Sequence, residues 1–335
     1  MAKDLALRAH QQQALDALKN SFEQGERRIL VTMATGTGSS LVLVKSVELL
    51  LAKYKTVLIL SDRKDLVKKV AFRAQDQLRE DVYIPNTIMD LKECIHGQKH
   101  RLVASTAQKI WSIEPVSAVF DYFEVIIFFN MSRSFAESVK TKRSTFILPE
   151  HATQLFIGFS AAPNKYDYEY FGEPVYQYRL EEAVKDGYAV PVLLYSCNQY
   201  IKQKLDDRSY IEHLLNPLLK EVEVNPIRKV IVFCASKQEA GSVFNSLQGI
   251  FNSEKITLIL SGSPNSDVLA NSARMESSIQ IIISVDKLLT GYDFPGITDL
   301  ILFRSFSNRT IFQQAVSLGT RNFPGKTQLY VWDFG

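Results

Sequence analysis

The chain has 335 residues, of which 46% are hydrophobic and 22% charged, and its formal net charge is +3. This length is more than one hydrophobic core usually organises, so two domains are expected, and so small a charge does not by itself indicate a nucleic-acid-binding protein. The three cysteines and five histidines lack the spacing of metal ligands, and no apolar run is long enough to span a membrane. Because the N-terminus also lacks an apolar signal segment, we expect a cytoplasmic protein with no metal site and no membrane partner.

Apolar runs typical of buried strands alternate with amphipathic segments along the chain. In the first part, the predicted strands are residues 29–32, 56–60, 102–105, 125–129 and 154–159. In the second part, they are residues 190–195, 229–234, 255–260, 279–285, 299–303 and 328–333. Helical periodicity lies between them, for example over residues 41–53, 65–80 and 237–251. This alternation predicts an α/β protein in which mainly parallel sheets are flanked by helices.

A change of composition around residues 181–192 indicates a linker. There a helical segment runs into Asp186-Gly187-Tyr188-Ala189-Val190-Pro191, and a glycine and a proline so close together interrupt regular structure. We therefore expect one domain over residues 1–190 and a second over residues 191–335.

A glycine-rich loop follows the first predicted strand and reads Met33-Ala34-Thr35-Gly36-Thr37-Gly38-Ser39-Ser40. In a phosphate-binding loop, backbone N–H groups hold the phosphates, a lysine reaches the β- and γ-phosphates, and the next hydroxyl binds Mg²⁺. The loop keeps the other residues of this motif, which are Gly36, Thr37, Gly38 and Ser40, but Ser39 stands in place of the lysine. The pattern favours descent from a nucleotide-binding loop, although the glycines could also simply turn a strand into a helix.

Other motifs flank this loop in a fixed order along the chain. They are Leu7-Arg8-Ala9-His10-Gln11, Ser61-Asp62-Arg63-Lys64-Asp65-Leu66, Ser105-Thr106-Ala107-Gln108, Tyr170-Phe171-Gly172-Glu173-Pro174-Val175-Tyr176, Leu289-Thr290-Gly291-Tyr292-Asp293 and Gly319-Thr320-Arg321. In this order they resemble the motifs of superfamily 2 helicases and DNA translocases, over nearly the whole chain. The chain is similar in particular to the motor domains of the R subunits of type I and type III restriction enzymes.

The resemblance implies two tandem RecA-like domains and an ancestral activity in which ATP hydrolysis drives movement along DNA. It also implies that Gln11 meets the adenine and that Arg321 belongs to the nucleotide site. For Gln11, capping or solvating a helix is an equal alternative.

The departures from the family fall on the catalytic positions. Where the family has an aspartate that holds Mg²⁺ and a glutamate that polarises water, this chain has Phe129 and Asn130. Leu318 stands in place of the arginine finger, and Ser39 in place of the lysine. An arginine finger contributes about 10³ to 10⁵ in rate and a water-positioning group about 10² to 10⁴. The resemblance then implies a pseudoenzyme with a vestigial nucleotide site made by Gln11, Gly36, Thr37, Gly38, Ser40 and Arg321.

The positions that hold the nucleic-acid backbone in this family are better preserved. Positive charge comes from Arg63, Lys64, Lys68, Lys69 and Arg73, and hydroxyl, amide and ammonium donors from Thr106, Gln108, Thr290 and Lys287. Such contacts go to phosphates, so binding would be independent of base sequence and sensitive to salt. The alternative is that the lysines form an ordinary solvated helix face, and the choice between DNA and RNA also stays open.

A further stretch, residues 166–178, is rich in tyrosine and phenylalanine. Base stacking is one interpretation, but packing of this segment onto the first domain is favoured.

Three functions are compatible with these observations. The leading hypothesis is a catalytically inactive helicase-like protein that binds DNA or RNA, or acts as a scaffold for a partner such as an active motor or a nuclease subunit. The second is a working ATP-dependent DNA translocase with ATP and Mg²⁺ as cofactors. The third is a protein-interaction regulator of an intact motor or nuclease. Only the second predicts a bound cofactor.

Overall fold

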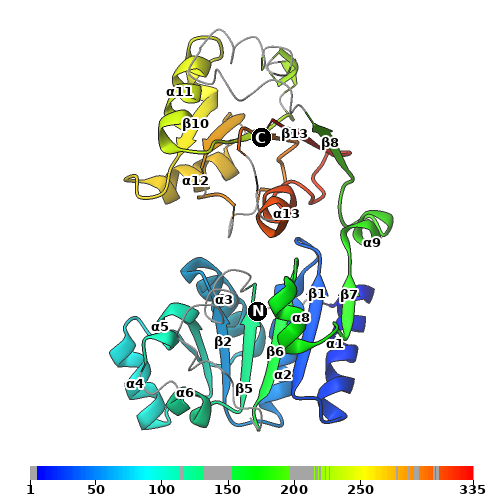
Figure 1. Ribbon diagram of the computed structural model, residues 1–335, viewed down its shortest axis with the longest axis vertical. Helices are drawn as coiled ribbons and strands as arrows, with labels where there is room; N and C mark the ends of the chain where they lie inside the picture. Colours follow the sequence, from blue (N-terminus) through cyan, green and yellow to red (C-terminus); the bar gives the residue numbers. More distant parts are fainter. Residues whose placement is uncertain are drawn as a thin grey trace. The chain divides into compact units, whose positions relative to one another are not determined.

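The computed structural model describes residues 6–113, 117–130, 153–196, 227–276, 278–285, 294–304 and 309–334, with 215, 218, 220–222, 224–225, 287–289 and 306 (Figure 1). The chain divides into two compact units, Met1–Arg179 and Leu180–Gly335. Each unit has its own sheet, and every strand pair in both sheets is parallel. The α/β class with parallel sheets flanked by helices is confirmed. In the described part of the chain, no helix is long and apolar enough to cross a membrane.

The first unit is a seven-stranded sheet with the order β3-β4-β2-β5-β6-β1-β7. Its strands are β1 (Arg28–Met33), β2 (Val57–Ser61), β3 (Val82–Tyr83), β4 (Leu102–Thr106), β5 (Val125–Phe129), β6 (Leu155–Ser160) and β7 (Tyr176–Tyr178). Its helices are α1 (Ala9–Glu23), α2 (Ser39–Leu51), α3 (Lys64–Leu78), α4 (Ile88–Gly97), α5 (Ala107–Trp111), α6 (Ser117–Tyr122) and α8 (Lys165–Phe171).

Helices cover both faces of this sheet, which explains why its central strands are apolar on both sides. On one face, alternate strand residues such as Leu30, Leu58 and Ile126 pack with residues of α4, α5, α6 and α8. Helices α1, α2 and α3 lie on the other face (Figure 1). The loops at the carboxyl ends of the strands remain for ligands, as in other open parallel sheets.

The second unit is a six-stranded sheet with the order β10-β11-β9-β12-β13-β8. Its strands are β8 (Val192–Ser196), β9 (Val230–Phe233), β10 (Ile256–Ile259), β11 (Ile281–Ser284), β12 (Asp299–Leu302) and β13 (Leu329–Asp333). Its described helices are α9 (Leu180–Lys185), α11 (Lys237–Gln248), the 3-10 turn Ser253–Lys255, α12 (Ser266–Met275) and α13 (Arg309–Ser317). Two hydrophobic clusters form its core, one on each face of the sheet.

All the strands predicted from the sequence are present within two residues of their expected ends, whereas the short strands β3 and β7 were not predicted. The expected domain boundary followed residue 190, but in the structure α9 and the segment after it group with the second unit. The reason is a set of backbone contacts, because Ala189 bridges to Arg321 and the N–H of Val190 donates to the carbonyl of Thr320 at 2.8 Å.

Candidate functional site

The glycine-rich loop joins β1 to α2 at the carboxyl end of β1, which lies between β6 and β7 in the sheet. Gly36 and Gly38 have φ values of 89° and 96°, a left-handed conformation that residues with a side chain rarely adopt. Thr37 closes the loop, since its N–H and its hydroxyl both donate to the carbonyl of Ala34, at 3.2 and 2.6 Å. Helix α2 begins at Ser39, with Gly38 as its N-cap. The strand, loop and helix of a phosphate-binding loop are therefore all in place.

Two buried side chains of α1 hold this loop from one side. The amide nitrogen of Gln11 donates to the carbonyl of Thr37 at 2.8 Å, and the Nε2 atom of His10 lies 2.9 Å from the same oxygen. The amide oxygen of Gln11 accepts from the N–H of Arg8 at 2.9 Å. A Cβ atom on Gly38 would lie only 2.1 Å from the Gln11 nitrogen. Gln11 thus supports the loop directly, and whether it also meets an adenine stays a prediction.

The metal-binding position differs from that of a nucleotide-hydrolysing loop. The hydroxyl of Ser40 accepts a hydrogen bond from the guanidinium of Arg73 on α3. Phe129, 4% exposed, ends β5 where the family has its first acid, and Asn130 follows with φ of 50°. In the described residues, no group of three or more His, Cys, Asp or Glu side chains could hold a metal. Mg²⁺ requires oxygen ligands, so a phenyl ring and a guanidinium at this place do not fit it.

The last motif lies in the second unit and is largely buried. Leu318 is 5% exposed and belongs to a hydrophobic core cluster with Ile297 and Leu329. Arg321 is half-buried and forms the bridge to Ala189. Lys326, which the sequence did not single out, donates to the carbonyls of Pro295 and Gly319, and burial lowers its pKa to about 8. The ammonium group of Lys326 therefore stabilises the turn that contains this motif.

Apart from Lys287 in the second unit, the proposed nucleic-acid residues that the structure describes lie in the first unit, and Thr290 falls outside the described residues. Lys64 and Lys68 are exposed on α3, whereas the guanidinium of Arg63 pairs with Asp65. The amide of Gln108 donates to the carbonyl of Asp62 at 3.1 Å. Thr106 is 6% exposed, so its hydroxyl is less accessible than expected. The structure thus brings Gln108 beside the start of α3 and leaves the lysines of α3 as the main exposed donors.

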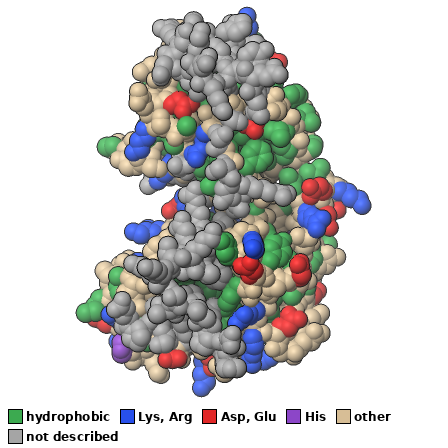
Figure 2. All heavy atoms as spheres, viewed as in Figure 1, with side chains coloured by type: hydrophobic (Ala, Val, Ile, Leu, Met, Phe, Trp, Pro, Cys, Tyr) green, Lys and Arg blue, Asp and Glu red, His purple; other side chains and the backbone are tan. Residues whose placement is uncertain are grey.

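The exposed lysines of α3 form a basic surface, and two further residues, Lys109 and Phe72, lie beside it. The sequence alone did not single these two residues out. Lys109 lies near Lys64, since burial and then the charge of Lys64 lower the pKa of Lys109. Phe72 is 73% exposed and stands eight residues after Lys64 on α3, so the helical period places Lys64, Lys68 and Phe72 along one stripe. On the face shown in Figure 2, Lys and Arg side chains alternate with Asp and Glu and form no continuous basic patch among the coloured residues.

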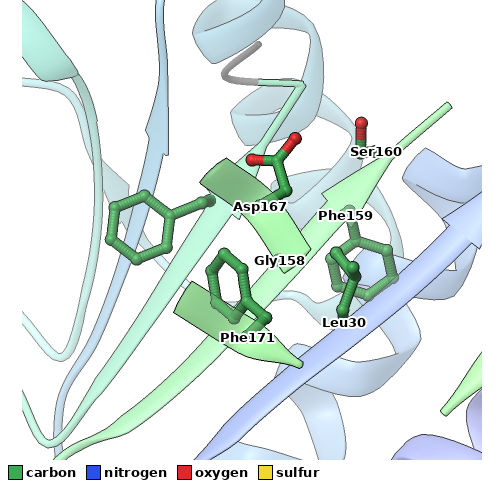
Figure 3. A pocket seen from close by; sticks show the side chains of 7 residues that line it. Leu30, Gly158, Phe159, Ser160, Asp167 and Phe171 are labelled. Atoms are coloured by element: carbon green, nitrogen blue, oxygen red, sulfur yellow. The ribbon is translucent and has the colours of Figure 1, made fainter. Parts of the chain in front are cut away.

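A small cavity lies between β1, β5, β6 and α8. Its lining consists of Leu30, Phe128, Gly158, Phe159, Ser160, Asp167 and Phe171 (Figure 3). With a volume of about 10 Å³, it has room for no more than about one water molecule. Tyr166, Tyr170 and Phe171 pack here against the core of the sheet, so the interpretation of the aromatic stretch as a packing element is confirmed.

Asp167 is the one ionisable side chain of this cavity and is 7% exposed. Burial raises its pKa to about 6, the nearby charge of Asp62 adds to that effect, and the hydrogen bond from the N–H of Asn164 opposes it. That N–H lies 2.7 Å from the Asp167 carboxylate. The carboxylate of Asp167 therefore caps the N-terminus of α8, but burying its negative charge away from water costs free energy.

Comparisons with known proteins find a helicase-related or restriction-enzyme family in each part of the chain. Residues 4–165 match the family described as "Type III restriction enzyme, res subunit", and residues 211–318 match "Helicase conserved C-terminal domain". The chain is 22% identical to the type I restriction enzyme EcoKI endonuclease subunit of Escherichia coli K12, with 98% of this chain and 34% of that protein covered. It is 23% identical to the EcoAI endonuclease subunit of Escherichia coli, with 94% of this chain and 44% of that protein covered.

Solved structures share the fold. The fragment structure of a putative HsdR subunit of a type I restriction enzyme from Vibrio vulnificus YJ016 has a TM-score of 0.74 and 21% identity, and covers 99% of this chain and 65% of that one. The type ISP restriction-modification enzyme LlaBIII bound to DNA has a TM-score of 0.73 and 16% identity, with 98% and 28% covered. The chain spans less than half the length of the two Escherichia coli relatives.

Each unit has a parallel sheet flanked by helices, so the protein is of the class with two tandem RecA-like domains. The two family matches, together with the relatives that cover nearly the whole chain, narrow this class further. The chain belongs to the superfamily 2 helicase group and is related to the motor domains of restriction enzymes.

Proposed function

We propose that this protein is a catalytically inactive superfamily 2 helicase-like protein that binds nucleic acid, or acts as a scaffold subunit, without hydrolysing ATP. The observation that carries the proposal is the end of β5, where a buried phenylalanine, Phe129, stands in place of the carboxylate that would hold Mg²⁺. Ser39, Asn130 and Leu318 replace three further groups of the reaction. Since a finger arginine and a water-positioning group each contribute at least about a hundredfold in rate, their joint loss leaves turnover negligible, although such effects do not simply add.

The proposal includes the nucleic-acid backbone as ligand. The related structure of LlaBIII is described as bound to DNA, and the exposed lysines of α3 offer donors for phosphates. The relatives from Escherichia coli are named as endonuclease subunits, which favours a partner such as an active motor or nuclease. A cytoplasmic location belongs to the same proposal.

Calorimetric titration with Mg·ATP, repeated with single-stranded or duplex DNA already bound, tests the proposed function. We expect no nucleotide signal and no phosphate release, together with DNA binding that weakens as salt is raised. Release of phosphate that DNA stimulates and that Ser40→Ala abolishes would instead establish a working translocase. Absence of any nucleic-acid binding at low salt, with a stable protein partner, would favour the regulator.

Removing two of the three exposed lysines of α3, Lys64 and Lys68, is expected to weaken nucleic-acid binding without changing its sequence preference. The Lys64→Ala/Lys68→Ala double variant should bind single-stranded DNA roughly tenfold to a hundredfold more weakly. Its slope of log affinity against log salt should fall by about 1.4, because each phosphate contact on a single strand contributes about 0.7 to that slope. Fluorescence anisotropy at several salt concentrations measures both quantities.

The matched control is Lys19→Ala/Lys99→Ala, which removes the same charge from exposed positions elsewhere on the first unit. An equal loss of affinity in this control would mean that only net charge matters, and that α3 is an ordinary solvated helix.

A further inference from the structure

Arg73 makes an unusual contact with the glycine-rich loop. It lies in the second half of α3 and donates from its guanidinium to the hydroxyl of Ser40, the second residue of α2. The two residues are 33 positions apart in the chain, so the contact arises from the packing of α3 against α2 on one face of the sheet.

Arg73 differs in its burial from the three lysines of α3, which are exposed. Its immediate neighbour Ala74 is buried, as is Val70 one turn earlier, and Arg73 itself is half-buried. Lys64 and Lys68 are exposed on the outer side of the helix. The guanidinium of Arg73 therefore contacts the loop, whereas the sequence alone places it on the basic surface proposed for nucleic acid.

The hydroxyl that Arg73 engages is the one that binds the metal in a phosphate-binding loop. A metal needs a lone pair of this oxygen, and one of its two lone pairs here accepts an N–H bond from Arg73. A guanidinium is permanently charged and has no lone pair to give, and a second cation a few ångström away would be repelled. The other protein ligand that the metal would need is missing, because β5 ends in Phe129.

We infer that Arg73 is a resident cation that takes the place of Mg²⁺ at this loop and keeps the metal out. The inference rests on the proposed function and deepens it, since it names the step that is blocked as metal coordination at Ser40. Phe129 is consistent with this role of Arg73. When no metal is bound at the loop, no carboxylate is needed at the end of β5 to hold it.

Whether the contact exists in solution is tested by a double-mutant cycle that needs no ligand. We expect Arg73→Ala and Ser40→Ala each to lower the midpoint of thermal unfolding, and the double variant to lower it no further than the larger single effect. Arg79→Ala, at the exposed C-terminal end of the same helix, is the matched control and should leave the midpoint unchanged. Additive effects of Arg73→Ala and Ser40→Ala would overturn the inference.

Metal exclusion is tested with Mn²⁺ as the probe, followed by electron paramagnetic resonance, in the presence of ADP. The wild-type chain should leave Mn²⁺ free, and Phe129→Asp alone should bind it only weakly, because Arg73 still occupies the hydroxyl of Ser40. Phe129→Asp/Arg73→Ala should bind Mn²⁺ on the order of tenfold more tightly than Phe129→Asp. Circular dichroism checks that the Phe129 variants are folded. The double-mutant cycle of Arg73 and Ser40 does not depend on these variants.

The outcomes separate the two proposals. Mn²⁺ bound at the loop of the wild-type chain without ATP hydrolysis would overturn the role of Arg73 and leave the inactive helicase-like protein standing. Equal Mn²⁺ affinity of the two Phe129→Asp variants would also overturn that role. ATP hydrolysis by the wild-type chain would overturn the proposed function, and the unfolding cycle would still report on the contact between Arg73 and Ser40.

Discussion

Arg228→Ala is expected to destabilise the second unit by about 3 to 5 kcal/mol, because it leaves a buried carboxylate without its ion-pair partner. Asp299 on β12 is fully buried, and Arg228 donates to both of its oxygens, at 2.8 and 2.5 Å. The same guanidinium also reaches Glu221 at 2.9 Å and lies over the ring of Tyr330. A loss of this size is a large fraction of the stability of an ordinary domain.

The measurement is urea unfolding followed by the fluorescence of Trp332, in a Trp111→Phe background. The chain has two tryptophans, one in each unit, and the indole N–H of Trp332 lies 3.4 Å from the Asp299 carboxylate, so Trp332 reports on the unit that is changed. Arg274→Ala on α12 removes an exposed arginine of the same unit and should change the free energy of unfolding by no more than about 0.5 kcal/mol. If the two variants lose the same stability, the ion pair does not hold the sheet together.

The architecture could be predicted from the sequence because its signal is local. Runs such as Val125–Phe129 are apolar at every position, as strands covered on both faces must be, and the observed strand has the same ends. β7 (Tyr176–Tyr178) was missed because three residues are too short for a period to emerge. The grouping of α9 with the second unit was missed because it depends on Ala189 and Val190 contacting a segment more than a hundred residues away.

The candidate site was predictable only in part. Gly36 and Gly38 indicate a tight turn, and in the structure both residues have a positive φ. The hydrogen bond from Arg73 to Ser40 could not be predicted, since it joins two helices and depends on how α3 packs. Phenylalanine is a residue type that is usually buried, and only the structure shows that Phe72 is exposed. Lys326 gives no sequence signal, because burial of a lone lysine depends on the carbonyl groups that surround it.

Asp167→Asn is expected to stabilise the first unit at neutral pH by an amount that approaches 3 kcal/mol. Burial raises the pKa of Asp167 from the model-compound value of 3.8 to about 6, and each pKa unit corresponds to about 1.4 kcal/mol. Asparagine removes the charge but keeps an oxygen that can accept from the N–H of Asn164, 2.7 Å away in the wild-type chain. Glu169→Gln on the same helix removes a charge from an exposed pair with Lys165 and should change little.

The raised pKa of Asp167 determines in which direction this stability difference changes with pH. The folded-state pKa of Asp167 lies above that of the unfolded chain, so between pH 3.8 and about 6 the folded state binds more protons than the unfolded state. The contribution of Asp167 to stability is fully present below pH 3.8 and is lost as the pH rises through about 6. Urea unfolding followed by Trp111 in a Trp332→Phe background, at several pH values, should therefore show the advantage of Asp167→Asn disappear as the pH falls through this range. An advantage that stayed constant with pH would mean that the asparagine acts through packing, and that the buried carboxylate costs the fold nothing.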